Sequence, residues 1–173
     1  MTSKPDISKI EGVGDLAKGR PTLGDTMSIA VYRMVVDSIK TAITMEYGVE
    51  KTAEIIYRAG EHAGRVMYAG FLRNVKDETE LFEKVRDLFL IFKIGFFEVV
   101  SKDDENREFL FDISEDLDCS GLPEDGSTKC IFDEGLISGI LYSFYGRHYI
   151  THEISCWGTG EESCVFKSVS AQE

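Results

Sequence analysis

The sequence predicts an α+β domain in which a layer of about four helices covers a twisted antiparallel sheet and a hairpin closes the C-terminal end. Apolar residues recur at helical spacing in segments over residues 28–95 and 131–145, and they alternate with polar residues in the other segments beyond residue 96. No linker or internal repeat divides the chain, and 173 residues suffice to bury a core without disulfide bonds.

The charge of the chain excludes several classes of partner. There are 19 Lys and Arg against 31 Asp and Glu, a net charge of −12, whereas nucleic acids and anionic membrane surfaces are bound by clustered basic side chains. No apolar stretch approaches the roughly 18 residues of a membrane span, and the first residues lack a hydrophobic signal core. We therefore expect a cytoplasmic protein with no nucleic acid and no membrane as partner. In that reducing compartment its four cysteines would be metal ligands or free thiols rather than disulfides.

The first half of the chain is expected to be helical after an irregular start. Glycines and a proline interrupt residues 1–26, which we expect to form an N-terminal arm, while residues 27–170 form a single domain. Apolar residues surround most of a helix over 28–47, so this helix is predicted to be largely buried. A second helix over 49–72 has a charged stripe opposite a face of small residues. That face should pack closely on another helix, in the same subunit or across a dimer: Ala59, Gly60, Ala63 and Gly64.

The remaining elements follow from caps and from the change of period. Asp77 followed by Glu80 fits the start of a third helix, which ends near Gly95. Alternating apolar residues then predict a hairpin with one buried face, and a loop rich in acidic residues, Gly and Ser follows. The segments expected after the third helix are strands around 97–99 and 109–113, a helix over 131–145, and strands over 148–156 and 163–169.

Three cysteines and one glutamate near the C-terminus form a candidate metal site. Cys130, Glu153, Cys156 and Cys164 would supply three thiolates and one carboxylate, enough to saturate a tetrahedral zinc ion. Residues i and i+3 of a strand lie on opposite faces, so Glu153 and Cys156 converge only if the chain leaves the regular pleat near Ser155 or Cys156. Two alternatives remain open: the cysteines are small buried hydrophobes, or Cys156 and Cys164 form a disulfide across the hairpin.

Several segments resemble the 4-vinyl reductase domain family. Its C-terminal signature is matched by residues 135–139, 150–156 and 160–166, and its N-terminal half by residues 19–25, 32–33 and 57–60. The resemblance covers roughly residues 19–168. It implies a fold similar to that of the transport-protein-particle (trafficking) subunits, commonly dimeric, with a helical layer on a twisted antiparallel sheet.

The resemblance also implies a ligand set for the metal. Sensor members of the family hold one zinc ion through Cys, Glu, Cys and Cys, which correspond here to Cys130, Glu153, Cys156 and Cys164. Four protein ligands leave no open position, so the zinc would be structural and would hold the C-terminal hairpin, although departure of Glu153 would admit water and create a catalytic site. Cys119 falls outside the pattern, as a loop thiol or a substitute ligand for Cys130.

The function implied by the resemblance is the binding of a small apolar or aromatic molecule between the helices and the sheet. Aromatic residues of the third helix, the 109–113 strand and the fourth helix would line the ligand site, unless they fill a solid core. The candidates are Phe89, Phe92, Phe109, Phe111, Tyr142 and Tyr145.

Three functional hypotheses result. The leading one is a zinc-stabilised, sensor-like, homodimeric domain that acts through a partner protein. A second is a reductase or accessory protein acting on a vinyl group of a tetrapyrrole, with electrons from a bound flavin or a donor protein. The third is a scaffolding subunit. The sequence contains no P-loop, no nucleophile elbow and no zinc-protease motif, which favours binding over catalysis.

Overall fold

The computed structural model of the 173-residue chain describes residues 5, 7, 10 and 12–171. Two compact units divide within one helix, Met1–Glu54 and Ile55–Glu173. The expected N-terminal arm lies partly outside the described residues, and its described part contains a short helix, α1 (Leu16–Gly19). The arm and the single domain over 27–170 remain expectations.

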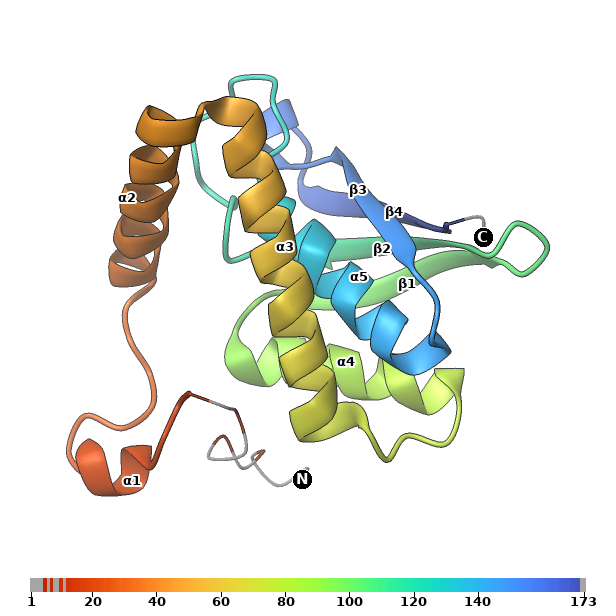
Figure 1. The fold of residues 1–173 in the computed structure, drawn as a ribbon, viewed down its shortest axis with the longest axis horizontal. Coiled ribbons are helices and arrows are strands. Elements are labelled where there is room, and N and C mark those ends of the chain that lie inside the picture. Colours follow the sequence, from red (N-terminus) through yellow and green to blue (C-terminus); the bar gives the residue numbers. More distant parts are fainter. Residues whose placement is uncertain (1–4, 6, 8–9, 11, 172–173) are drawn as a thin grey trace. The chain divides into compact units, whose positions relative to one another are not determined.

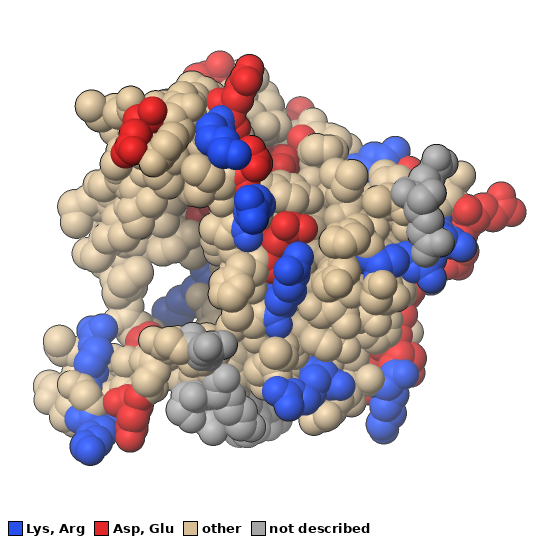
Figure 2. Space-filling model, in the orientation of Figure 1, with Lys and Arg blue, Asp and Glu red and all other residues tan. Residues whose placement is uncertain are grey.

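The first long helix is α2 (Ile29–Tyr47), with the bounds that the sequence predicts. The Ser28 side chain accepts a hydrogen bond from the Ala30 N–H at its start, and Gly48 ends it. The prediction that this helix is largely buried is wrong, because none of its side chains is buried. The surface over α2 is mostly uncharged in Figure 2. An apolar pattern indicates that a helix has surface to cover but does not identify what covers it.

Helix α3 (Val49–Met67) continues into a π-helical turn, η2 (Tyr68–Leu72), so the predicted helix over 49–72 is present. Its charged stripe lies at the surface, where Figure 2 shows basic and acidic side chains together along α3. Pairs one turn apart contribute ion pairs, among them Lys51 Nζ to Glu54 Oε2 at 2.6 Å and Arg65 to Glu61 at 3.8 Å.

The second unit continues with α4 (Glu78–Phe92) and the hairpin β1 (Phe96–Asp103) and β2 (Glu108–Ser114). Asp77 caps α4 as predicted, since its Oδ1 accepts a hydrogen bond of 2.9 Å from the Glu80 N–H. The last elements are α5 (Ile131–Tyr145), β3 (Tyr149–Ser155), the 3₁₀ turn η3 (Trp157–Thr159) and β4 (Ser163–Ser170).

The four strands form one antiparallel sheet in the order β1-β2-β4-β3. Helix α4 packs against β1 and α5 against β3, while α3 crosses α5 (Figure 1). The predicted α+β class, with helices on an antiparallel sheet, is therefore confirmed. Within the described part of the chain, no helix combines the length and apolar character needed to cross a membrane.

The small-residue face of α3 makes the close helix contact that the sequence predicts, and the partner helix belongs to the same subunit. A Cβ atom at Gly60 would lie 2.1 Å from the Phe132 carbonyl oxygen, and one at Gly64 would lie 2.2 Å from that of Leu136. On α5, Gly135 and Gly139 approach α3 equally closely. Ala59, in contrast, is exposed, because it lies beside this contact rather than in it.

Candidate metal centre and aromatic layer

A buried cluster of thiols and carboxylates lies where four segments meet. The loop after β2 supplies Asp116 and Cys119, and Cys130 is the residue immediately before α5. Strand β3 and the turn after it supply Glu153 and Cys156, and β4 supplies Cys164. All four cysteines are buried free thiols, so the structure contains no Cys156–Cys164 disulfide.

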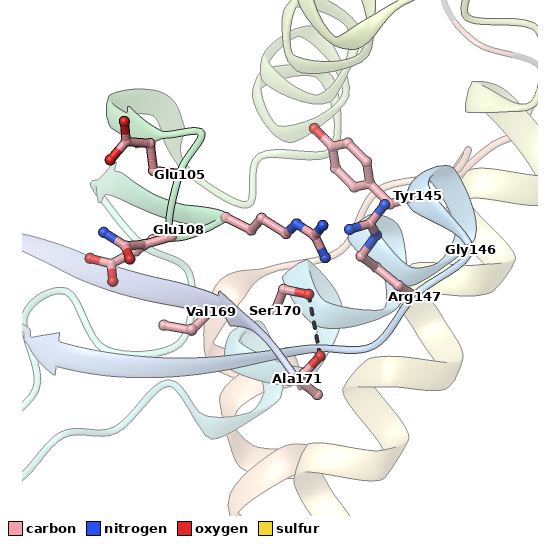
Figure 3. Close-up of a pocket in the computed structure, with 10 residues that line it drawn as sticks. Glu105, Glu108, Tyr145, Gly146, Arg147, Val169, Ser170 and Ala171 are labelled. Atoms are coloured by element: carbon pink, nitrogen blue, oxygen red, sulfur yellow. Dashed lines mark hydrogen bonds between the residues drawn. The ribbon is translucent and has the colours of Figure 1, made fainter. Parts of the chain in front are cut away.

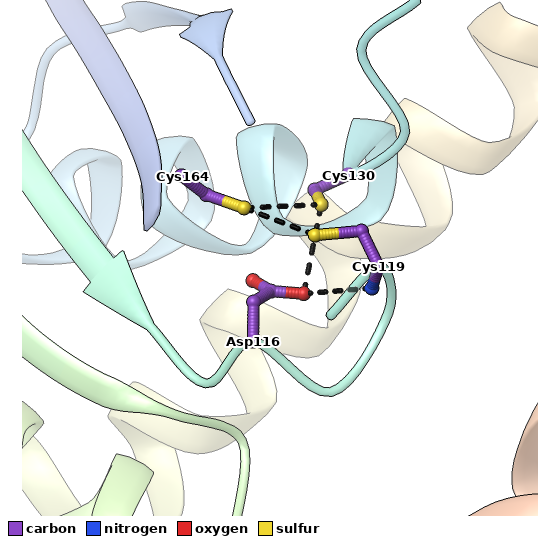
Figure 4. Close-up of side chains that lie close together, drawn as sticks. All are labelled: Asp116, Cys119, Cys130 and Cys164. Carbon is purple, nitrogen blue, oxygen red and sulfur yellow. Dashed lines mark hydrogen bonds between the residues drawn. The ribbon is translucent and has the colours of Figure 1, made fainter. Parts of the chain in front are cut away.

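One group of four side chains in the cluster contains Cys164. The ligand atoms of Asp116, Cys119, Cys130 and Cys164 all lie within 4.8 Å of one another, and Figure 4 shows these side chains directed toward one another. The Cys164 Sγ is 3.1 Å from the Cys119 Sγ and 3.7 Å from the Cys130 Sγ. The Cys130 Sγ is 3.5 Å from the Asp116 Oδ1. This arrangement has the size of a metal-coordination site.

A second group also includes Cys164. The ligand atoms of Glu153, Cys156 and Cys164 lie within 4.8 Å of one another. The register of β3 shifts between Glu153 and Ser155, which is the break in the pleat that the sequence required for Glu153 and Cys156 to converge. The Glu153 Oε2 accepts hydrogen bonds of 2.9 Å from the Lys129 and Cys130 N–H groups, while its buried Oε1 has no hydrogen-bond partner among the described residues.

The predicted ligand set is thus distributed over two adjoining groups. Cys164 belongs to both groups, Cys130 lies with Asp116 and Cys119, and Glu153 lies with Cys156. Sequence reasoning placed Cys119 outside the main pattern and missed Asp116 altogether. The signal available was the spacing Asp116-x2-Cys119, since Cys119 is the only cysteine of the 114–130 loop apart from the predicted ligand Cys130.

Burial and mutual repulsion shape the acidity of the cluster. Burial, reinforced by Cys119 and Asp118, raises the pKa of Asp116 to about 8. Hydrogen bonds with Cys130 and Cys164 lower the pKa of the Cys119 thiol, whereas those of Cys130 and Cys164 are raised. Just beyond the cluster, burial raises the pKa of Glu134 to about 7. A divalent cation would offset this concentration of acidic groups.

A second feature is a layer of aromatic rings between α4, α5 and the sheet. Phe109 and Phe111 stack with centroids 5.6 Å apart, and Tyr145 lies 5.9 Å from Phe109. Phe82, which the sequence prediction missed, contacts both Phe109 and Phe111 at 5.5 Å. Phe89 joins the layer through Phe97, at 5.1 Å.

Two of the predicted ligand-binding residues have their ring contacts elsewhere. Phe92 pairs with Phe71 at 5.6 Å, and Tyr142 lies against His148 at 4.6 Å and the Arg65 guanidinium at 4.9 Å. Phe97 and Tyr149 belong to the layer and were missed, although the alternation of inward-facing residues along β3 includes Tyr149.

Surface hollows lie at both ends of this layer. One, of about 960 Å³, has Tyr145 and Arg147 on its wall, with the turn before β2 and the end of β4 on the other side (Figure 3). The other, of about 380 Å³, is lined by Phe82, Phe97 and polar residues of α4 and β1. Because Phe109 contacts both Tyr145 and Phe82, the aromatic layer runs from one hollow to the other.

The fold and the cluster define a class of protein: an α+β domain with helices on a four-stranded antiparallel sheet and a buried thiol–carboxylate centre, able to hold a metal ion, at its C-terminal hairpin. The sequence profile of the 4-vinyl reductase domain matches residues 109–169. Uncharacterized protein MJ0150 of Methanocaldococcus jannaschii is 30% identical over 157 residues, which cover 89% of this chain and 84% of that protein. The chain belongs to the 4-vinyl reductase domain family.

Solved structures share the fold at low sequence identity. A vinyl-4-reductase family protein from Methanocaldococcus jannaschii has a TM-score of 0.63 at 14% identity, with 99% of each chain covered. The phenol-responsive sensory domain of the transcription activator PoxR, with phenol, also scores 0.63 at 14% identity and covers 83% of this chain and 75% of its own. A trafficking protein particle complex subunit 3 from Naegleria fowleri, covalently bound to palmitic acid, scores 0.64 at 15% identity, with 83% and 95% covered.

Proposed function

We propose that the chain is a zinc-stabilised, sensor-like domain that binds a small apolar or aromatic molecule and acts through a partner protein in the cytoplasm. The observation that carries the proposal is the aromatic layer that connects two surface hollows above a metal-binding hairpin. Free buried thiols fit a reducing compartment.

Zinc is the proposed metal because thiolates dominate the ligand set. Cys130, Glu153, Cys156 and Cys164 would hold it, with three sulfur atoms and one carboxylate oxygen in the coordination that structural zinc sites use. The unpartnered Glu153 Oε1 supports a cation here, since buried carboxylate oxygens are rarely left without a partner. The ion would cross-link α5 to both strands of the C-terminal hairpin.

The ligand would enter the aromatic layer from one of its two ends. Phe82 and Tyr145 are only half-buried, so each can rotate toward solvent more readily than the fully buried Phe111. An aromatic or aliphatic molecule would then replace ring contacts with its own apolar surface. Two proteins of the same fold support this chemistry, one bound to phenol and the other to palmitic acid.

A thermal-shift screen tests the ligand proposal. A molecule that binds only the folded state stabilises it by about 2.7 kcal/mol at a hundredfold excess over Kd, so a panel of phenols, fatty acids, isoprenoids and tetrapyrroles should yield a saturable rise in melting temperature. Phe82→Ala should change the Kd of the active compound. Phe71→Ala, which removes a half-buried ring outside the layer, is the control and should leave the Kd unchanged.

The scaffolding alternative is favoured by a specific observation. Phe89 and Phe111 are fully buried and the rings of the layer pack directly on one another, with neighbouring centroids 5.1–5.6 Å apart for several pairs. If no compound in the panel raises the melting temperature, these rings form a solid core. The scaffolding function then replaces the sensor function.

A homodimer through α2 is part of the proposal. Val31, Val35 and Ile39, spaced by one turn, are 44%, 47% and 51% exposed, which leaves an apolar stripe for a second copy to cover. Light scattering is expected to find a dimer, and Val35→Asp should convert it to a monomer. Thr41→Asp introduces the same charge at an exposed position off the Val31–Val35–Ile39 stripe of α2 and should remain dimeric. A wild-type monomer would rule out this assembly.

A further inference from the structure

The cluster at the C-terminal hairpin supplies more ligands than one zinc ion can use. A tetrahedral ion takes four, whereas six buried side chains meet here, each able to donate a sulfur or an oxygen atom. These six are Asp116, Cys119, Cys130, Glu153, Cys156 and Cys164. Asp116 and Cys119 are the two that the zinc site described above leaves without a role.

We propose that the cluster holds two divalent metal ions, with the thiolates of Cys130 and Cys164 bridging them. The inference rests on the proposed zinc site, which supplies the first ion, and adds a second position with Asp116 and Cys119 as its own ligands. When two thiolates are shared, six side chains give each ion four ligands. Each ion then has two bridging sulfurs, one terminal sulfur and one carboxylate oxygen.

The distances around the second position fit a tetrahedral ion. Zinc–sulfur bonds of about 2.3 Å and zinc–oxygen bonds of about 2.0 Å place two sulfur ligands about 3.8 Å apart, and a sulfur and an oxygen about 3.5 Å apart. The Cys130 and Cys164 sulfurs are 3.7 Å apart, and the Cys130 Sγ is 3.5 Å from the Asp116 Oδ1. The Cys119–Cys164 distance of 3.1 Å is shorter, so the Cys119 sulfur would withdraw slightly on binding.

Unpartnered carboxylate oxygens support both positions. Asp116 is 1% exposed, and its Oδ2 has no hydrogen-bond partner among the described residues, as is also true of the Glu153 Oε1. The other Asp116 oxygen accepts hydrogen bonds from the Asp118 and Cys119 N–H groups at 2.7 and 3.2 Å, which fix the orientation of the carboxylate. Each position therefore has a buried carboxylate that is oriented by backbone N–H groups and still has an unpartnered oxygen.

The charge of the cluster also favours two ions. With all six ligands ionised, one divalent ion leaves a formal charge of −4 in a buried site, whereas two leave −2. Uncompensated charge is costly to bury, and zinc and similar cations readily keep thiols deprotonated. The second ion thus makes full ionisation of the six ligands compatible with burial.

Metal stoichiometry provides the test. Apoprotein, reduced and kept under anaerobic conditions, is titrated with zinc, washed with a weak chelator and weighed by native mass spectrometry. We expect two ions per chain in the wild type and one in Asp116→Asn and Cys119→Ser. Glu115→Gln removes a charge from the neighbouring, exposed residue and should still bind two ions. One ion in the folded wild type overturns the second position alone, and no ion overturns the proposed zinc site as well.

Cobalt(II) substitution distinguishes a bridged pair from two separate ions. Two cobalt ions that share thiolates couple magnetically, so the electron paramagnetic resonance signal per ion should fall as the second ion binds. Asp116→Asn, with one ion, should keep the full signal. Two ions with undiminished signal in the wild type, or two ions still bound by Asp116→Asn, would overturn the bridged site.

Discussion

Removal of metal from the cluster is expected to lower the melting temperature by about 10–20 °C. Structural zinc contributes about 10–16 kcal/mol to the folding of small zinc domains, and loss of even about 5 kcal/mol corresponds to that shift in a chain of this size. Without metal, four thiols and two carboxylates would have to be buried without a cation. The measurement is a thermal melt with and without a strong chelator.

Cys164→Ser gives the matched variant, because Cys164 is the only residue present in both groups of candidate ligands. This variant should melt near the temperature of the chelated wild type, and chelator should change its melting temperature little. If chelator leaves the wild-type curve where it was, and Cys164→Ser melts like the wild type, the cysteines are simply buried hydrophobes. That outcome is the alternative that the sequence left open.

The sequence predicts most of the fold because helices and strands leave periodic patterns. The bounds of α2 and α5, the Asp77 cap and the break in β3 near Ser155 all agree with the structure. Burial of α2 was predicted wrongly for a physical reason. Periodicity records which side chains avoid water, but the covering surface can belong to the same chain, a second copy or another protein.

The metal centre is less accessible to sequence reasoning than the fold. Resemblance to a family directs attention to Cys130, Glu153, Cys156 and Cys164. Asp116 lies in an acidic loop without periodicity, among several carboxylates of the same type, so nothing in its local sequence distinguishes it. Only the pairing of β2 with β4, with Ile113 opposite Cys164, brings this loop to the cluster.

Gly60→Leu is expected to destabilise the protein by at least about 3 kcal/mol, which corresponds to a fall in melting temperature of about 6–12 °C. The cause is the crossing of α3 and α5, where each helix presents glycine to the backbone of the other. A Cβ at Gly60 would lie 2.1 Å from the Phe132 carbonyl oxygen and 2.9 Å from the Leu136 nitrogen. Neither atom belongs to a side chain that can rotate away, so the helices must separate.

Separation of these helices would also disturb the metal centre, because α5 begins immediately after Cys130. Gly60→Leu is therefore expected to weaken zinc retention in the same native mass spectra that measure stoichiometry. Ala59→Leu adds the same side chain at the neighbouring exposed position and should change stability by no more than about 0.5 kcal/mol. A Gly60→Leu protein with the melting temperature and metal content of the wild type would mean that α3 and α5 do not cross as closely as described.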